Sequence, residues 1–239
     1  MKISHYLLSF TVLVAAIGGS ANAAQINCGS WRLAVETNNL IKWATVPIQC
    51  GKYVEKYMLG HQYKDDVNYM AEEAWTYAQS VNLTGKGKPI WVYDIDDTTL
   101  SNLPYYVQHG FGTLPYNATS YNEWEAKGIA PPVRGVLRLY KNLLSVGIGA
   151  VFMSGKPDFR LEVVTKNLNN AGYRNIERLY LKGGNFTGKS TGFMKQSLRT
   201  MLVNEGYRIV GNIGDHWSDI TGNDAGERTF KVPDPMYYV

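Results

Sequence analysis

Apolar residues recur along the chain with two alternating spacings, one typical of helices and one of buried strands. Over 65–80 they fall at three- and four-residue intervals, which predicts an amphipathic helix with Asp65 as its N-cap. Gly85 and Gly87 follow this helix. The continuous apolar run 89–93 then predicts a buried strand.

The same succession of helix, glycine and strand is repeated three times further along the chain. Helices are predicted to open at Pro131, at Pro157 and at Phe193, and the strands that follow them are predicted over 148–153, 176–181 and 207–210. A glycine stands just past each helix, where a left-handed residue is the usual stop. Alternating helices and buried strands indicate an α/β fold, a parallel sheet with helices on both faces.

The N-terminus carries the features of a secretory signal. Lys2 gives a positive start, residues 7–18 form an apolar stretch, and Ala21-Asn22-Ala23 is a cleavage site with small outer residues. An uncleaved membrane anchor is the alternative, but the apolar stretch is shorter than the roughly 20 residues that span a bilayer. We therefore expect a signal peptide over 1–23, a single domain over 24–239 and no membrane association once the signal is removed.

Composition indicates an ordinary globular protein. The chain has 239 residues, of which 45% are hydrophobic and 18% charged, within the range of one domain. Its 24 basic and 20 acidic residues leave a net charge of +4, without the local run of Lys and Arg that binding to a phosphate backbone needs. Nucleic acid is therefore not an expected partner.

A secretory signal changes what the cysteines and the Asn-x-Thr sequons imply. Cys28 and Cys50 are the two cysteines, and in an oxidising compartment we expect them to pair, the alternative being two buried free thiols. The candidate glycosylation sites are Asn82, Asn117 and Asn185. The expected destination is the vacuole or the cell exterior, and the sequence does not distinguish them.

Three acids follow the first predicted core strand: Asp94, Asp96 and Asp97. Parallel sheets bind ligands at the carboxyl ends of their strands, so this cluster is a candidate catalytic site. A solvated loop cap is one alternative. A calcium loop is another, but Thr99 stands where such a loop requires glycine.

Polar residues also follow the other predicted strands. Ser154 ends the strand that begins at 148, and Asp215 and Asp219 follow the last one. The helix between them presents Lys195 and Arg199. Taken alone, Ser154 could be a helix cap, Lys195 a solvated charge and Asp219 part of a surface turn. Together these residues place carboxylates, a hydroxyl and a cation at the same edge of one sheet.

This set resembles the four motifs of the haloacid-dehalogenase-like phosphohydrolases. Longer stretches are similar to the plant acid phosphatase and vegetative storage protein family, the class B-like acid phosphatases: WRLAVETNN (31–39), SNLPYY (101–106), GNIGD (211–215) and PDPMYY (233–238). The resemblance implies a Rossmann-like α/β sheet. It also implies N-terminal helices over 24–88 and a small cap insertion over 100–132.

The resemblance further implies catalytic roles. Asp94 is expected to attack phosphorus and form an aspartyl-phosphate, and Asp96 to act as general acid and then as general base. Mg²⁺ is the expected cofactor, held by Asp94, the backbone carbonyl of Asp96 and Asp215. Asp219 would support the metal without binding it directly.

The substrate implied by the resemblance is a small phosphomonoester, with Ser154 and Lys195 on its phosphoryl oxygens. Two departures from the family are visible. Asp97 stands where Glu is usual, and Ser154-Gly155-Lys156 stands where Thr-Gly-Arg is usual. The serine keeps the hydroxyl, whereas the lysine keeps the charge but loses the bidentate fork of arginine.

Two alternative functions remain open at this point. Some members of the family are storage proteins that lack the nucleophilic Asp, so a catalytically weak or inactive storage glycoprotein is the alternative to an acid phosphatase, although Asp94 favours catalysis. Residues 183–190 (GGNFTGKS) also match a P-loop. Only about fifty residues follow that stretch, too few for the sheet of such an NTPase, and a glycan on Asn185 would block the cradle. A glycine-rich surface loop is favoured.

The insertion 100–132 is rich in aromatic side chains, which either form a lid that selects the leaving group or pack the insertion against the N-terminal helices: Tyr105, Tyr106, His109, Phe111 and Trp124. The natural substrate and the oligomeric state are left open, with a homodimer as one option.

Overall fold

The computed structural model describes residues 26–238, so the predicted signal peptide over 1–23 lies outside the described residues. Its centre is a sheet of five parallel strands in the order β3-β2-β1-β4-β5. These are β1 (Lys88–Asp94), β2 (Gly149–Pro157), β3 (Arg178–Lys182), β4 (Tyr207–Gly214) and β5 (Arg228–Lys231). The predicted α/β class with a parallel sheet is confirmed.

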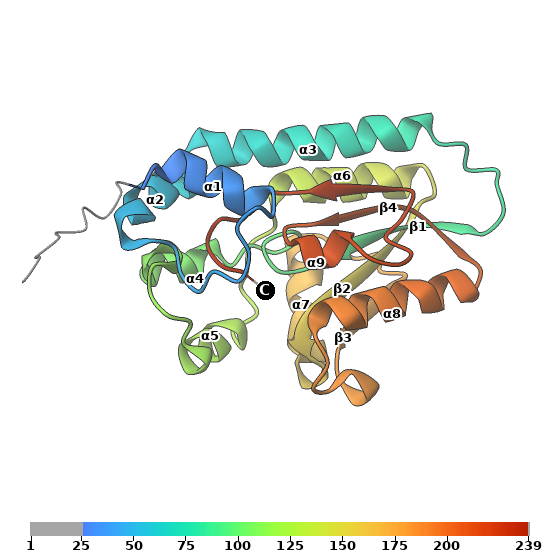
Figure 1. The fold of residues 1–239 in the computed structure, drawn as a ribbon. Coiled ribbons are helices and arrows are strands. Elements are labelled where there is room, and N and C mark those ends of the chain that lie inside the picture. The colour runs from blue at the N-terminus through green and yellow to red at the C-terminus, as the bar shows by residue number, and fades with distance from the viewer. Residues whose placement is uncertain (1–25, 239) are drawn as a thin grey trace, which may run out of the picture.

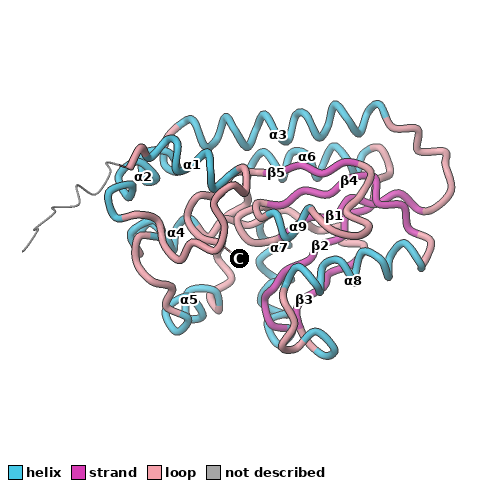
Figure 2. Tube along the Cα trace, viewed as in Figure 1, coloured by secondary structure: helices cyan, strands magenta, loops and turns pink. Residues whose placement is uncertain are grey.

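Helices cover both faces of this sheet (Figure 2). They are α3 (His61–Ser80), α6 (Arg134–Ser145) and α7 (Leu161–Ala171) on one face and α8 (Thr191–Asn204) on the other. The two-residue period of β1 explains the arrangement, because Trp91 and Tyr93 belong to the core under α3 and α6, whereas Ile90 and Val92 pack with the apolar side of α8. All four side chains are buried, as the continuous apolar run predicts.

The remaining elements lie around the carboxyl edge of the sheet (Figure 1). Before the sheet come α1 (Cys28–Glu36), a 3-10 turn (Ile48–Cys50) and α2 (Gly51–Leu59). The segment 100–132 contains α4 (Leu103–Gln108), a 3-10 turn (Gly110–Gly112) and α5 (Ala118–Glu125). Short 3-10 turns at Asp158–Arg160 and Gly184–Phe186, and α9 (Trp217–Ile220), complete the described chain.

The structure moves several element boundaries; β2, for example, runs on to Pro157, and the helix predicted to open there begins at Leu161. Helix α3 begins at His61, with Gly60 as N-cap, and not behind Asp65 as predicted. Its first turn is stabilised by Tyr63, which is buried edge-on against Tyr57 with the ring centroids 6.0 Å apart. Strand β4 runs on to Gly214, beyond the predicted 207–210, because its second half pairs with β1 on one side and on the other with β5, a strand that the sequence analysis missed.

The N-terminal helices are joined by the predicted disulfide between Cys28 and Cys50, whose Cα atoms lie 5.3 Å apart. It ties the start of α1 to the 3-10 turn before α2. Within 26–238, no helix has both the length and the apolar character needed to cross a bilayer.

Candidate active site

Because all five strands are parallel, their carboxyl ends meet at one edge, and the predicted site residues meet there too. Asp94 is the last residue of β1, Ser154 lies in β2, and Asp215 directly follows β4. A cavity of about 600 Å³ opens at this edge, and its lining includes Asp94, Asp96, Lys195 and Asp219. Asp215 lies behind that lining and is only 1% exposed.

Lys195 is the central cation of the site. Its ammonium group donates to a carboxylate oxygen of Asp94 and, over 2.6 Å, to Oδ1 of Asp219. All three side chains are nearly fully buried. Burial raises the pKa of Asp94, and the charges of Asp219 and other carboxylates add to this rise against the opposing charge of Lys195. Burial is thus the main cause of the raised pKa, and the neighbouring carboxylates add to it.

Asp96 lies beside Asp94 and has different partners. Ser154 Oγ donates to its Oδ2 over 2.8 Å, and the ammonium group of Lys156 donates to its Oδ1. Burial alone would raise the pKa of Asp96, but the charge and hydrogen bond of Lys156 and the hydroxyl of Ser154 hold that pKa below its usual value. Asp96 is therefore an anion in this arrangement.

Asp215 is held by neighbours on two sides. Thr98 Oγ1 donates to its Oδ1 over 2.8 Å, and Nδ1 of His216 lies 2.5 Å from its Oδ2. Burial lowers the pKa of His216, but the charge of Asp215 outweighs this effect and raises that pKa to about 10. Burial alone would raise the pKa of Asp215, but the contact with His216 outweighs this effect and lowers that pKa.

Among the described residues, Asp215, His216 and Asp219 form a cluster whose ligand atoms lie within 4.8 Å of one another. Two of these three residues offer carboxylate oxygens, the type of donor that Mg²⁺ prefers. The carboxylates that raise the pKa of Asp94 supply the negative charge that a divalent cation would offset. The residues at this edge therefore fit such a cation.

Asp219 and Arg199 have contacts that the sequence analysis did not foresee. Besides Lys195, Asp219 accepts the backbone N–H of His216 over 3.0 Å and so closes the first turn of α9. Arg199 lies one turn beyond Lys195 on α8 and donates to the backbone carbonyls of Asp219, over 2.8 Å, and of Thr221. Arg199 thus holds the end of α9, the helix that carries Asp219.

The segment 183–190 is a surface loop. It forms the turn Gly184–Phe186 and then the N-cap of α8, where Ser190 accepts the backbone N–H of Phe193. A side chain at Gly183 would meet the carboxylate of Asp158, so an acid lies where a phosphate cradle would need open space. This geometry agrees with the glycine-rich loop favoured above.

Some aromatic residues of 100–132 line the active-site cavity, as a lid would, and others pack into the protein interior. Tyr105, Tyr106 and His109 line the cavity. Phe111 is instead buried in the core, and Trp124 packs behind Tyr105 with the ring centroids 6.0 Å apart. The segment therefore both walls the cavity and packs against the rest of the chain.

Sequence reasoning missed several residues of the site. Lys156 was noted only as a departure, yet it also contacts Oε1 of Glu125 on α5 over 2.8 Å. His216 and Tyr237 were not singled out, although both line the cavity. A signal for both was present in the sequence. Tyr237 lies inside the stretch PDPMYY, and His216 directly follows GNIGD, two stretches quoted for the family resemblance.

The family model of the HAD superfamily, subfamily IIIB (acid phosphatase), matches residues 14–239. Acid phosphatase 1 of Solanum lycopersicum is 40% identical over 215 residues, covering 90% of this chain and 84% of that protein. Vegetative storage protein 1 of Arabidopsis thaliana is also 40% identical over 215 residues, covering 89% and 79%.

Among solved structures, the class C acid phosphatase from Bacillus anthracis matches with a TM-score of 0.67 at 23% identity, over 80% of this chain and 85% of that one. This likeness shows the HAD-like fold. The family model and the relatives show more: the chain belongs to subfamily IIIB of the HAD superfamily and is an acid phosphatase. The family resemblance drawn from the sequence is confirmed.

Proposed function

We propose that this acid phosphatase hydrolyses small phosphomonoesters with the help of Mg²⁺, through a covalent phosphoryl intermediate on Asp94. The observation that carries the proposal is the contact of Lys195 with both Asp94 and Asp219 at the wall of the cavity. A carboxylate nucleophile repels a phosphate dianion, and a buried cation beside it offsets that repulsion.

In the first step a carboxylate oxygen of Asp94 would form a bond to phosphorus while the bond to the leaving oxygen breaks. Asp96 would give that oxygen a proton, which requires the acid form of a group whose pKa is held low by Lys156. Acidic conditions favour that form. Lys195 and the hydroxyl of Ser154 would bind the phosphoryl oxygens.

In the second step a water molecule would attack the phosphoryl group on Asp94. Asp96 has then lost its proton and is the base that accepts one from this water. The contacts of Asp96 with Lys156 and Ser154 stabilise its anionic form and suit this role.

Asp94, the backbone carbonyl of Asp96 and Asp215 would hold the metal, with Asp219 and His216 around them. When bound, Mg²⁺ would neutralise charge on the phosphoryl oxygens. Thr98 and His216 fix the carboxylate of Asp215 before any ligand arrives.

We also propose how the chain is divided into a catalytic domain, an N-terminal part and a cap. Residues 24–239 would form one phosphatase domain, with 24–88 as its N-terminal helical part and 100–132 as a cap that meets the leaving group. A small phosphomonoester fits a cavity of about 600 Å³.

The proposal includes entry into the secretory pathway through residues 1–23 and residence in the vacuole or outside the cell. The disulfide and the exposure of Asn82, Asn117 and Asn185 support it. N-terminal sequencing of the protein from its native tissue should find Ala24 first, and an N-glycosidase should reduce its mass. A chain that starts at Met1 would contradict this route.

The decisive assay is hydrolysis of an aryl phosphate by the purified protein, with and without a chelator. We expect turnover that chelation abolishes and Mg²⁺ restores. The second candidate is a weak or inactive storage glycoprotein, favoured by the similarity to vegetative storage protein 1. No turnover at any pH in the presence of Mg²⁺ would favour that candidate and contradict the phosphatase.

A further inference from the structure

The last described residues, 232–238, here called the C-terminal tail, return to the active site. Strand β5 is followed by a bond from the backbone N–H of Val232 to the carbonyl of Gly214, and residues 232–236 are all buried. Figure 1 shows the red end of the chain between the sheet and the helices α1, α2 and α4. The tail therefore crosses the edge where the catalytic side chains meet.

Tyr237 in this tail contacts two of the loops that build the site. Its hydroxyl donates to Oδ2 of Asp97 over 3.0 Å. Its carbonyl lies 3.2 Å from Nε2 of His216, and because a carbonyl only accepts, this ring nitrogen is the donor. Tyr237 thus touches the loop after β1 and the loop after β4.

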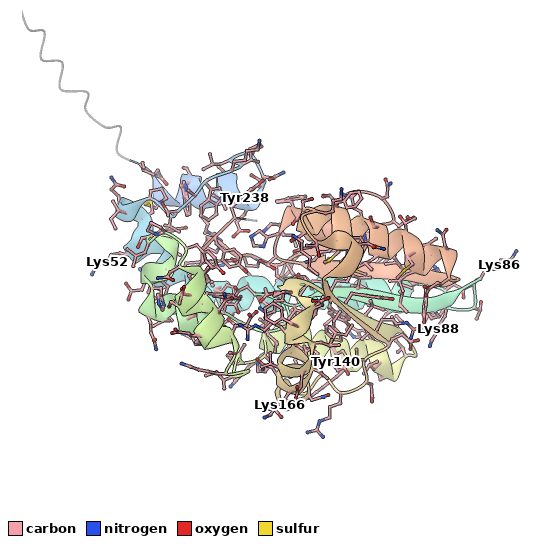
Figure 3. The ribbon with its side chains drawn as sticks, turned by 90° about the horizontal axis from the view of Figure 1, so that it is seen from below. Lys52, Lys86, Lys88, Tyr140, Lys166 and Tyr238 are labelled. Atoms are coloured by element: carbon pink, nitrogen blue, oxygen red, sulfur yellow. A yellow bond between two sulfur atoms is a disulfide. The ribbon has the colours of Figure 1, made fainter. Side chains whose placement is uncertain are left out.

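The tail also contacts the segment 100–132 and the N-terminal part. The ring of Tyr237 stacks on that of Tyr106, with centroids 5.3 Å apart and planes 12° from parallel. The carbonyl of Met236 packs so closely on Gly112 that a Cβ there would lie 1.9 Å from its oxygen. Tyr238 lies next to the N-terminal helices in Figure 3, with its ring 6.3 Å from that of Trp43.

Asp97, the partner of Tyr237, has no solvent exposure and lies next to Asp96 in the catalytic loop. Its backbone is left-handed, with φ of 54°, a conformation that Asp tolerates better than most residues. Its Oδ1 accepts the backbone N–H of Asn102 over 2.7 Å, so its two oxygens join the loop to α4 and to the tail.

We infer that Tyr237 is a positioning residue for catalysis. Through its hydrogen bond to Asp97 it fixes the position of Asp94 and Asp96 relative to the cavity wall formed by Tyr106. This inference rests on the proposed phosphatase function. It assigns the C-terminal tail to the active site, where the tail fixes the distance between the nucleophile and the surface that meets the leaving group.

The first test is Tyr237→Phe, which removes the hydroxyl and keeps the stacking on Tyr106. We expect kcat to fall roughly ten- to hundredfold, the effect of a small displacement of reacting groups. KM should stay within about twofold, because the hydroxyl that is removed bonds to Asp97 and the ring stays in the cavity wall. Tyr69→Phe, on an exposed tyrosine of α3, is the matched control and should leave kcat unchanged.

A double-mutant cycle distinguishes positioning through Asp97 from general loosening. The cycle compares the effect of Tyr237→Phe on kcat in the wild type with its effect in the Asp97→Asn variant. If Tyr237 acts through Asp97, the loss of kcat should be smaller in the Asp97→Asn variant. The same cycle in urea unfolding, which needs no substrate, should show coupling between the two residues. Additive effects in both measurements would overturn the inference.

The second test moves the tail from its other side. Gly112→Ala would push on the Met236 carbonyl at a φ of 82°, whereas Gly147→Ala has a similar φ of 86° and no atom within 4 Å. Both variants bear similar backbone strain, so a loss of kcat in Gly112→Ala alone, larger than its loss of stability in urea unfolding explains, reports on the tail. Equal kcat in the two variants would overturn the inference.

The outcomes separate the inference from the function on which it rests. If the wild-type chain hydrolyses no phosphomonoester, the proposed function fails and the positioning role is overturned with it. If the wild type is active and Tyr237→Phe keeps full kcat, only the inference fails.

Discussion

Lys156 contacts the carboxylate of Asp96, so the proposed general acid rests as an anion beside a buried cation. The lysine belongs to β2 and the aspartate to the loop after β1, and the parallel pairing of these strands brings them together. Oε1 of Glu125 lies 2.8 Å from the same ammonium group, which extends the contact to α5.

This contact predicts how activity depends on pH. A lowered pKa means that Asp96 is protonated only at low pH, so the acid needed for the first step becomes available as the pH falls. Lys156→Met should raise the pKa of Asp96 and move the acid-requiring limb of the profile to higher pH. Profiles of kcat/KM for an alkyl phosphate, which needs leaving-group protonation, measure the shift. Lys156→Arg keeps the charge and should retain the wild-type limb; an unchanged profile in Lys156→Met would contradict the role of this cation.

The two carboxylates of the loop should fail in different ways. Asp94→Asn should abolish turnover, since a neutral amide does not attack phosphorus. Asp96→Asn should still be phosphorylated slowly by an aryl phosphate, whose leaving group needs little protonation, but hydrolysis of the intermediate should stall. Mass spectrometry after brief exposure should then find a phosphoryl group on the peptide containing Asp94. A phosphoryl group on a histidine or serine would overturn the assignment.

Replacing Asp215 should weaken the binding of Mg²⁺. Asp215→Asn removes a charge from the proposed Mg²⁺ site and should raise the Mg²⁺ concentration for half-maximal activity by about 10- to 100-fold. Circular dichroism should show a retained fold. Asp224→Asn, a charge removal at an exposed position, should leave the Mg²⁺ requirement unchanged. Full activity of the wild type after exhaustive chelation would remove the metal from the mechanism.

Lys195 should matter for stability as well as for catalysis. Lys195→Met leaves Asp94 and Asp219 buried without their cation, which should lower the free energy of unfolding by about 3–5 kcal/mol at neutral pH. Without Lys195 the folded-state pKa of Asp94, already raised by burial, rises further, so the deficit should shrink as acid protonates this carboxylate. Urea unfolding at two pH values tests this, with Lys189→Met at an exposed position as control. A pH-independent deficit would contradict the charge explanation.

The disulfide should stabilise the N-terminal helices. Replacing both Cys28 and Cys50 by Ala should lower the free energy of unfolding by about 3 kcal/mol, because a loop of this length is no longer closed in the unfolded chain. Thiol titration of the denatured, unreduced wild type should find no reactive thiol. Two reactive thiols would show that the pair does not form in the cell.

Much of this molecule could be predicted from the spacing of apolar residues alone. The run 89–93 became β1, and the glycines past the predicted helices are left-handed, with φ of 86° at Gly147 and 106° at Gly172. Parallel strands end at one edge, so Asp94, Ser154 and Asp215 had to converge once the strands were recognised. These are consequences of local pattern and of sheet geometry.

Other features were decided only by the tertiary structure. The four residues of β5 are too few to show a period, and they became a strand because β4 offered a free edge. Lys156 meets Glu125, and Tyr237 meets Asp97 from 140 residues away, without any local signal in the sequence. The physical reason is that a hydrophobic period reports how a segment faces the core, whereas partners of buried polar groups are chosen by whichever distant segment the folded chain places within hydrogen-bond reach.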